Sequence, residues 1–97
     1  MEADHDFTLI LDGISNLSQE VVDALFEAGC DDGTLSRSAG IVSMDFTRSA
    51  PSLKDAIISA IRDVQNANVG ARVVRVEGFE HALTEALDGD VLRLIGA

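Results

Sequence analysis

The segment Asp4-His5-Asp6 places an imidazole between two carboxylates, a combination of side chains that can bind a metal ion. Successive side chains of an extended segment point to opposite sides, so these three groups do not converge easily on one ion. The segment also precedes the first apolar run, which is typical of a solvated N-terminal extension. We therefore predict no metal site here, and no cofactor for the chain.

Cys30 is the second candidate for a chemical role, because a thiolate can act as a nucleophile. It follows the predicted end of a helix and precedes Asp31 and Asp32. The negative end of a helix dipole and two carboxylates raise a thiol pKa, which opposes thiolate formation. His81 would help only if the C-terminal segment folded back over this loop. We predict a structural cysteine, and a lone cysteine forms no disulfide framework.

The sequence contains no phosphate-binding, dinucleotide-binding, zinc-protease or hydrolase motif. The stretch between the first predicted strand and the first predicted helix reads LDGISNLS. It lacks the arginine of an acylphosphatase-type loop and the two cysteines of a metal-chaperone loop. The chain is therefore predicted not to be an enzyme.

The same loop leads to a helix N-terminus, where free amide groups can bind a carboxylate or a phosphate. It is loosely similar to the Asp-x-x-Gly loop that holds an effector in amino-acid-sensing ACT domains, although no proline precedes its glycine. In that interpretation Gly13, Ser15 and Asn16 contact a small ligand. The alternative is an ordinary connection between a strand and a helix.

Composition restricts the partners that this chain can have. Its 97 residues suffice for one domain, and 17 acidic residues against 7 basic ones give a net charge of −10. This charge repels nucleic acid and anionic membranes, and it suits a basic or DNA-binding protein partner. The N-terminus lacks the basic region of a signal peptide, and no apolar run is long enough to cross a bilayer. We predict a cytoplasmic protein without membrane contact.

The first half of the chain predicts a strand, a helix and a hairpin. The strand begins at Phe7 and stops at Asp12-Gly13, and both of its faces carry apolar residues, which places it centrally in a sheet. Ser18 caps a helix that ends at Gly29. Its predicted buried stripe consists of Val21, Val22, Leu25, Phe26 and Ala28. The segments TLSRS and IVSMDF then form a hairpin around Ala39-Gly40, with Val42, Met44 and Phe46 pointing inward.

The second half predicts another helix and another strand. Ser52 and Asp55 resemble a capping box, and Asn68 or Gly70 ends the helix. Its buried stripe consists of Ile57, Ala60, Ile61 and Val64, and the segment ARVVRVE is the next strand. The order β-α-β-β-α-β predicts an α+β, ferredoxin-like fold with a four-stranded antiparallel sheet and two helices on one face. Residues 1–6 form an extension, 7–77 the domain, and 78–97 an appendage with a short helix and a possible fifth strand.

The segments FTLILDGI, ALFEAGCDDGTL and GARVVRVE resemble the N-terminal domain of a bacterial family. The likeness runs from Phe7 to Glu77. In that family a helix-turn-helix DNA-binding segment usually follows, so the resemblance implies a regulatory or assembly domain. The last twenty residues here contain one arginine, Arg93, and leave no room for a DNA reader, so we carry no DNA contact over.

The leading hypothesis is therefore a non-catalytic interaction or regulatory domain that associates with itself. Two helices on one face of a sheet leave the other face free for a partner. Ile10, Ile41 and either Val74 or Val76 place apolar groups there, depending on the register, and a dimer would bury them. The alternative is an ACT-like small-molecule sensor that binds an amino acid.

Overall fold

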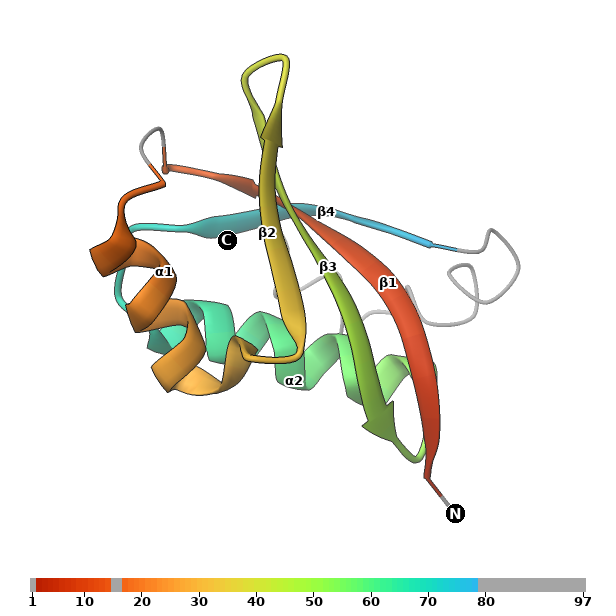
Figure 1. Cartoon of the computed structure of the whole chain (residues 1–97). Helices are drawn as coiled ribbons and strands as arrows, with labels where there is room; N and C mark the ends of the chain where they lie inside the picture. The colour runs from red at the N-terminus through yellow and green to blue at the C-terminus, as the bar shows by residue number, and fades with distance from the viewer. Residues whose placement is uncertain (1, 15–16, 79–97) are drawn as a thin grey trace.

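The computed structural model describes residues 2–14 and 17–78. The elements follow the order β1 (Ala3–Asp12), α1 (Gln19–Leu25), η1 (Phe26–Cys30), β2 (Gly33–Ser38), β3 (Ile41–Ala50), α2 (Leu53–Asn66) and β4 (Arg72–Glu77). The four strands form one sheet in the order β2-β3-β1-β4, and all neighbours run antiparallel. Both helices lie on the same side of this sheet (Figure 1). The predicted α+β architecture is confirmed, and it is compatible with the ferredoxin-like class.

Strand β1 is one of the two central strands, as predicted, but it begins at Ala3 instead of Phe7. Ala3 to Asp6 pair with the end of β3, which itself continues to Ala50. Most of the expected N-terminal extension is thus part of the sheet. A strand can include polar side chains in this segment because one face of the sheet is open to water.

Helix α1 begins as predicted, with the Ser18 hydroxyl accepting a hydrogen bond from the Val21 amide at 3.3 Å. It passes directly into the π-helical turn η1, in which Gly29 has φ +118°. Leu25 is fully buried, whereas Phe26 keeps 42% of its surface exposed. The prediction that Phe26 belongs to the buried stripe is therefore wrong. The helix turns this side chain away from the core because Leu25 already occupies the inner position.

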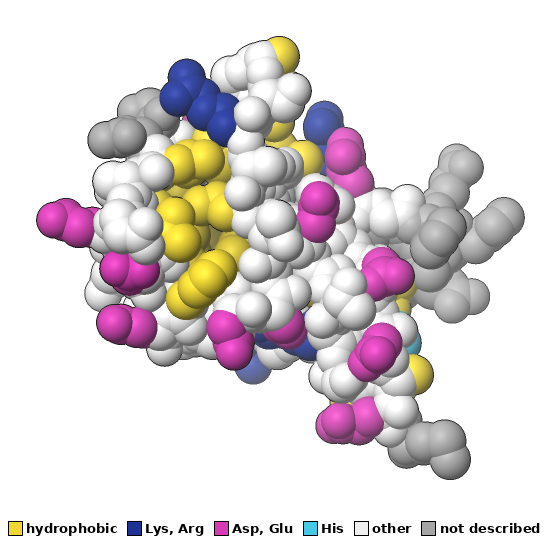
Figure 2. Space-filling model, in the orientation of Figure 1, with side chains coloured by type: hydrophobic (Ala, Val, Ile, Leu, Met, Phe, Trp, Pro, Cys, Tyr) yellow, Lys and Arg dark blue, Asp and Glu magenta, His cyan; other side chains and the backbone are white. Residues whose placement is uncertain are grey.

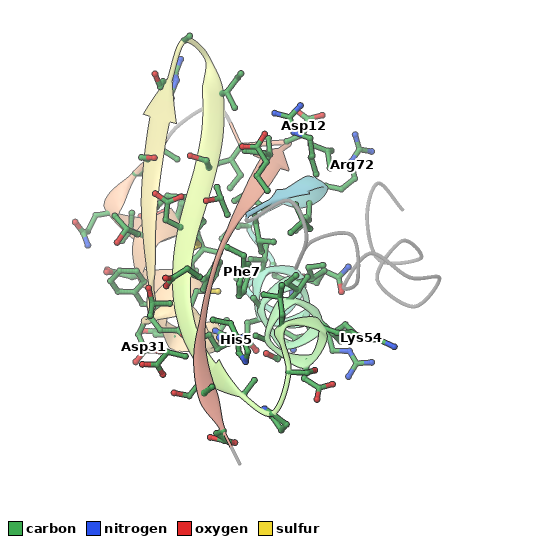
Figure 3. All side chains as sticks on the ribbon, turned by 90° about the vertical axis from the view of Figure 1, so that its right-hand side faces the viewer. His5, Phe7, Asp12, Asp31, Lys54 and Arg72 are labelled. Atoms are coloured by element: carbon green, nitrogen blue, oxygen red, sulfur yellow. The ribbon has the colours of Figure 1, made fainter. Side chains whose placement is uncertain are left out.

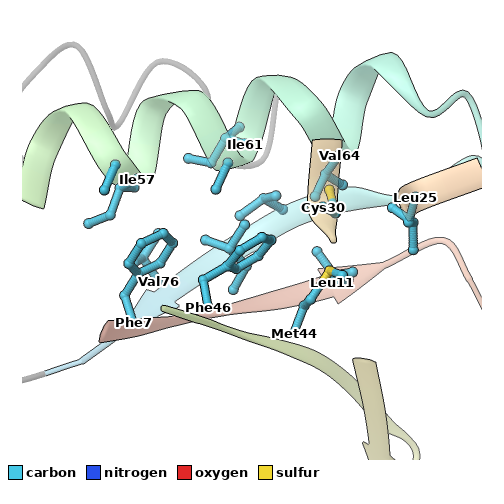
Figure 4. Close-up of a cluster of buried hydrophobic side chains, with 14 of the residues drawn as sticks. Phe7, Leu11, Leu25, Cys30, Met44, Phe46, Ile57, Ile61, Val64 and Val76 are labelled. Atoms are coloured by element: carbon cyan, nitrogen blue, oxygen red, sulfur yellow. The ribbon is translucent and has the colours of Figure 1, made fainter. Parts of the chain in front are cut away.

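The hairpin and helix α2 agree with the sequence pattern. Ala39 and Gly40 form the turn, both with positive φ, and Ser52 accepts a hydrogen bond from the Asp55 amide at 3.1 Å. Helix α2 packs its predicted stripe against β3, β1 and β4 (Figure 4). The core beneath it is almost entirely aliphatic, apart from the stacked rings of Phe7 and Phe46, whose centroids lie 5.4 Å apart. The predicted helix and strand in residues 79–97 lie outside the described residues.

Candidate interaction surface

The sheet has one covered face and one open face, and strand alternation determines which side chains reach each. On β1, Phe7, Leu9 and Leu11 are buried beneath the helices. The side chains between them point to the opposite side, together with their cross-strand neighbours on β3 and β4. We call this side the open sheet face. Most of the predicted interface residues belong to it.

One half of the open sheet face is polar. The hydroxyl of Thr47 donates to the Asp6 carboxylate at 2.7 Å, and Thr8 and Ser49 donate in the same way to Asp45 and Asp4. These bonds connect β1 to β3 through groups that remain exposed. Carboxylates that already have partners and stay in water gain little from burial against another protein. This half is therefore a poor contact surface for an apolar partner.

The other half contains a shallow concavity of about 340 Å³. Three strands supply its apolar residues: Ile10 from β1, Ile41 from the start of β3, and Val74 from β4. Ile41 is 50% exposed and Val74 is 36% exposed. The complete lining consists of Ile10, Leu11, Asp12, Gly40, Ile41, Val74 and Arg75. The structure thus brings together three of the four residues predicted for an interface.

The fourth predicted residue, Val76, lies in the core, where it is only 3% exposed. The register of β4 against β1 shifts between Ile10, which faces Arg75, and Leu11, which faces Val73. This β-bulge leaves Val74 as the additional residue, so that Val74 and Arg75 are both exposed. Simple alternation places Val74 and Val76 on the same face, and the bulge separates them, leaving Val74 exposed and Val76 buried.

The rim of the concavity is charged but internally paired. Arg72 donates to Asp12 at 3.2 Å, and Arg75 lies 2.9 Å from Glu77. Figure 3 shows Asp12 and Arg72 together at one end of the sheet. All four side chains are at least half exposed, so each pair adds little to stability. Their effect is that this end of the open sheet face carries balanced charge in a strongly acidic molecule.

The predicted ligand loop is only partly described, since Ser15 and Asn16 lie outside the described residues. Gly13 follows β1 with φ +88°, and its amide donates to the side chain of Asp12 at 2.9 Å. A Cβ atom at this position would stand 2.2 Å from the carbonyl oxygen of Gly70. Glycine is required here because two backbone segments meet. This requirement explains Gly13 without a ligand.

A buried ionic cluster surrounds Arg48, which is 8% exposed on the covered face of β3. Its guanidinium donates to both carboxylate oxygens of Asp32, at 2.7 and 2.8 Å, and to Asp63 at 2.9 Å. It also donates to Ser59 Oγ at 3.1 Å and to the Gly29 carbonyl at 2.8 Å. The hydrogen bond to Asp32 is the main cause that raises the pKa of Arg48. Because every nitrogen of this guanidinium has a protein partner, the cluster fastens elements together and offers no free group to a substrate.

Cys30 lies beside this cluster and is fully buried. Burial raises the pKa of its thiol to about 12, and the charge of Asp63 adds to the shift. The thiol therefore stays protonated near neutral pH, which makes it a poor nucleophile. The cause differs from the sequence-based argument, in which the helix dipole and the adjacent carboxylates were decisive.

The three residues of the N-terminal Asp-His-Asp segment diverge, as their spacing predicts. His5 faces the same side as Arg48, and its Nε2 lies 3.2 Å from the Ala50 carbonyl oxygen. Asp4 and Asp6 point to the open sheet face. Across residues 2–14 and 17–78, no three His, Cys, Asp or Glu side chains are grouped so that they could hold a metal ion.

No protein-family model, curated protein or solved structure matches the chain. Within the described part of the chain, no helix has the length and apolar character needed to cross a membrane.

Proposed function

We propose that this chain is a non-catalytic interaction or regulatory domain that associates with itself through the apolar end of its open sheet face. The observation that carries the proposal is the position of Ile10, Ile41 and Val74 around one concavity. Removing a large aliphatic side chain from water contributes roughly 1.5–3 kcal/mol. Three such residues from each of two copies supply a driving force for association.

The distribution of charge favours a contact between two copies at the same end of the open sheet face. Two molecules of net charge −10 repel each other, so a contact between copies needs a surface with little net charge. The Asp12–Arg72 and Arg75–Glu77 pairs provide this balance around the concavity. The carboxylates of Asp4, Asp6 and Asp45 keep the other half of the face in water.

Self-association is tested by sedimentation of the full chain across micromolar concentrations. We expect a concentration-dependent dimer that Ile41→Asp and Val74→Asp convert to a monomer. Phe26→Asp is the matched control, because it places the same charge at an exposed apolar position of the helix layer. A wild-type protein that sediments as a monomer throughout would exclude the proposal. Dissociation by Phe26→Asp alone would move the contact to another surface.

The second candidate function is the small-molecule sensor. The concavity supports it, because the apolar groups of Ile10, Ile41 and Val74 adjoin the carboxylate of Asp12 and the guanidinium of Arg75. This arrangement suits an aliphatic amino acid, whose ammonium and carboxylate need opposite charges. A ligand at one hundred times its dissociation constant stabilises a protein by about 2.7 kcal/mol. Thermal unfolding with leucine, isoleucine and valine tests this candidate, and unchanged melting temperatures exclude it for these three amino acids.

The strand order supports assignment to the ferredoxin-like arrangement. The relation to the N-terminal domain of bacterial DNA-binding proteins, the basic or DNA-binding partner and the cytoplasmic location stay predictions from the sequence.

A further inference from the structure

The concavity of the open sheet face lies at one end of the two central strands. It includes Asp12, the last residue of β1, and Ile41, the first residue of β3. From there β1 runs back to Ala3 and β3 runs forward to Ala50, and the two strands stay paired along this path. The rest of the open sheet face therefore projects to one side of the concavity.

This projecting part is the polar half of the face, and its charge is negative. It carries the exposed carboxylates of Asp4 and Asp6 from β1 and of Asp45 from β3. Strand β1 contains no lysine or arginine, and the one arginine of β3, Arg48, faces the covered side. Figure 2 shows acidic side chains along the lower right arm of the molecule, where Figure 1 places these two strands. Within these two strands, no cation balances the three carboxylates on this side.

Two copies that meet at their concavities form an isologous contact, in which a two-fold axis passes between the two sheets. If this axis runs along the strands, the polar half of one copy lies directly over the polar half of its partner. If the axis runs across the strands, the two polar halves extend from the contact in opposite directions. We call these the stacked and the divergent arrangement. Both bring the same apolar residues together, so the surroundings of the carboxylates distinguish them.

The stacked arrangement is unfavourable for these carboxylates. Packed sheets lie about 10 Å apart and their side chains interdigitate. Asp4, Asp6 and Asp45 would then be enclosed together with the same three residues of the second copy. Removing a carboxylate from water costs free energy unless a cation accompanies it. We infer that two copies associate in the divergent arrangement, with their concavities in contact and their polar halves in water; this inference rests on the self-association proposed above.

The test is a distance measurement between two spin labels in the dimer of the full chain. The label is attached to Ser49→Cys, because Ser49 is exposed at the far end of the polar half. Ser49 lies eight residues beyond Ile41, which places each label about 26 Å from the concavity at roughly 3.3 Å per residue. By pulsed electron paramagnetic resonance we expect the labels to be about 50 Å apart, whereas stacked polar halves would bring them within about 20 Å.

Two controls assign the distance to this contact. The wild-type chain, treated with the same reagent, should take up no label, since Cys30 is fully buried. Adding Ile41→Asp should abolish the distance, because it separates the two copies. A dimer with labels less than about 40 Å apart would overturn the divergent arrangement and leave the self-association in place. A monomer, or a distance that persists with Ile41→Asp, would overturn both.

Charge variants test the arrangement without a label. Asp6→Asn combined with Asp45→Asn removes two carboxylates from the polar half, and each amide oxygen can still accept the hydrogen bond from its threonine. Glu20→Gln combined with Asp23→Asn is the matched control, because it changes the net charge equally on exposed positions of α1. In sedimentation, we expect the two double variants to strengthen association equally, within about threefold, as screened charges far from the contact do. A larger gain from the open-face variant would show that the polar halves are enclosed between the copies, which overturns the divergent arrangement.

Discussion

Arg48 and Asp32 form a two-point ion pair in which Nε and Nη2 of the arginine meet Oδ2 and Oδ1 of the aspartate at 2.7 and 2.8 Å. Asp32 immediately precedes β2, and Arg48 lies on β3. The same guanidinium reaches Gly29 in η1 and Asp63 in α2. One side chain therefore joins both helical segments to the start of the edge strand.

Arg48→Met should destabilise the fold by about 2–4 kcal/mol, since it leaves Asp32 and Asp63 without their cation. The value lies toward the lower end for buried pairs because the two carboxylates keep 31% and 27% of their side-chain surface exposed. Urea unfolding measures the loss. Arg72→Met removes an arginine from the exposed pair with Asp12 and should cost less than about 1 kcal/mol. Equal losses in the two variants would contradict a structural role of the cluster.

The strands and helices were predictable because each depends on local pattern, and the ionic cluster was not. The alternation in Ile41–Phe46 predicts that Val42, Met44 and Phe46 point inward. The same alternation, continued for two residues beyond Phe46, predicts that Arg48 points inward as well. This signal was available, but an arginine normally ends an apolar strand pattern because charged side chains are seldom buried. Its partners come from three separate segments, so only the tertiary structure brings them together.

The choice between Val74 and Val76 shows a second limit of local pattern. Alternation cannot reveal a β-bulge, because the additional residue is determined by pairing with β1. For the candidate site, the sequence predicted Ile10 and Ile41 correctly as residues outside the core. It missed the paired charges of the rim, which depend on the register between β1 and β4.

Because of the β-bulge, substitutions of Val74 and Val76 should change the free energy of unfolding by different amounts. Val76→Ala should destabilise the monomer by about 2 kcal/mol, because it opens a cavity at a position that is 3% exposed. Val74→Ala should cost less than about 0.5 kcal/mol in dilute protein, since Val74 is already 36% exposed. Thermal unfolding at low protein concentration separates the two. The reverse order would place Val74 in the core and remove it from the concavity.

Alanine substitutions of Gly13 and Gly40 should separate two costs: that of a positive φ, and that of a steric clash with a neighbouring backbone segment. Both have positive φ, +88° and +79°, but only Gly13 has another backbone in the space of a Cβ atom. Gly40→Ala should cost about 1 kcal/mol for conformation alone. Gly13→Ala must also displace Gly70, so it should cost more than about 2 kcal/mol. Chemical denaturation of both variants measures the difference, and equal costs would contradict the contact between the two loops.

Cys30 should make the fold sensitive to alkaline pH. Its pKa is raised to about 12 in the folded protein from 9.0, so the folded state keeps a proton that the unfolded state releases. The stability due to this shift is complete below pH 9 and is lost as the pH rises toward 12. At pH 10 the loss should reach about 1 kcal/mol.

Cys30→Ala isolates this effect, because every other titrating group is common to both proteins. The variant should be less stable than the wild type at pH 7, where it lacks a buried side chain, and this difference should shrink between pH 9 and pH 11. Urea unfolding across this range measures both curves. Native protein should also react slowly with a thiol-specific disulfide reagent at pH 8, and denatured protein quickly. Parallel pH curves together with rapid labelling of the native protein would show that the thiol is accessible and ionises normally.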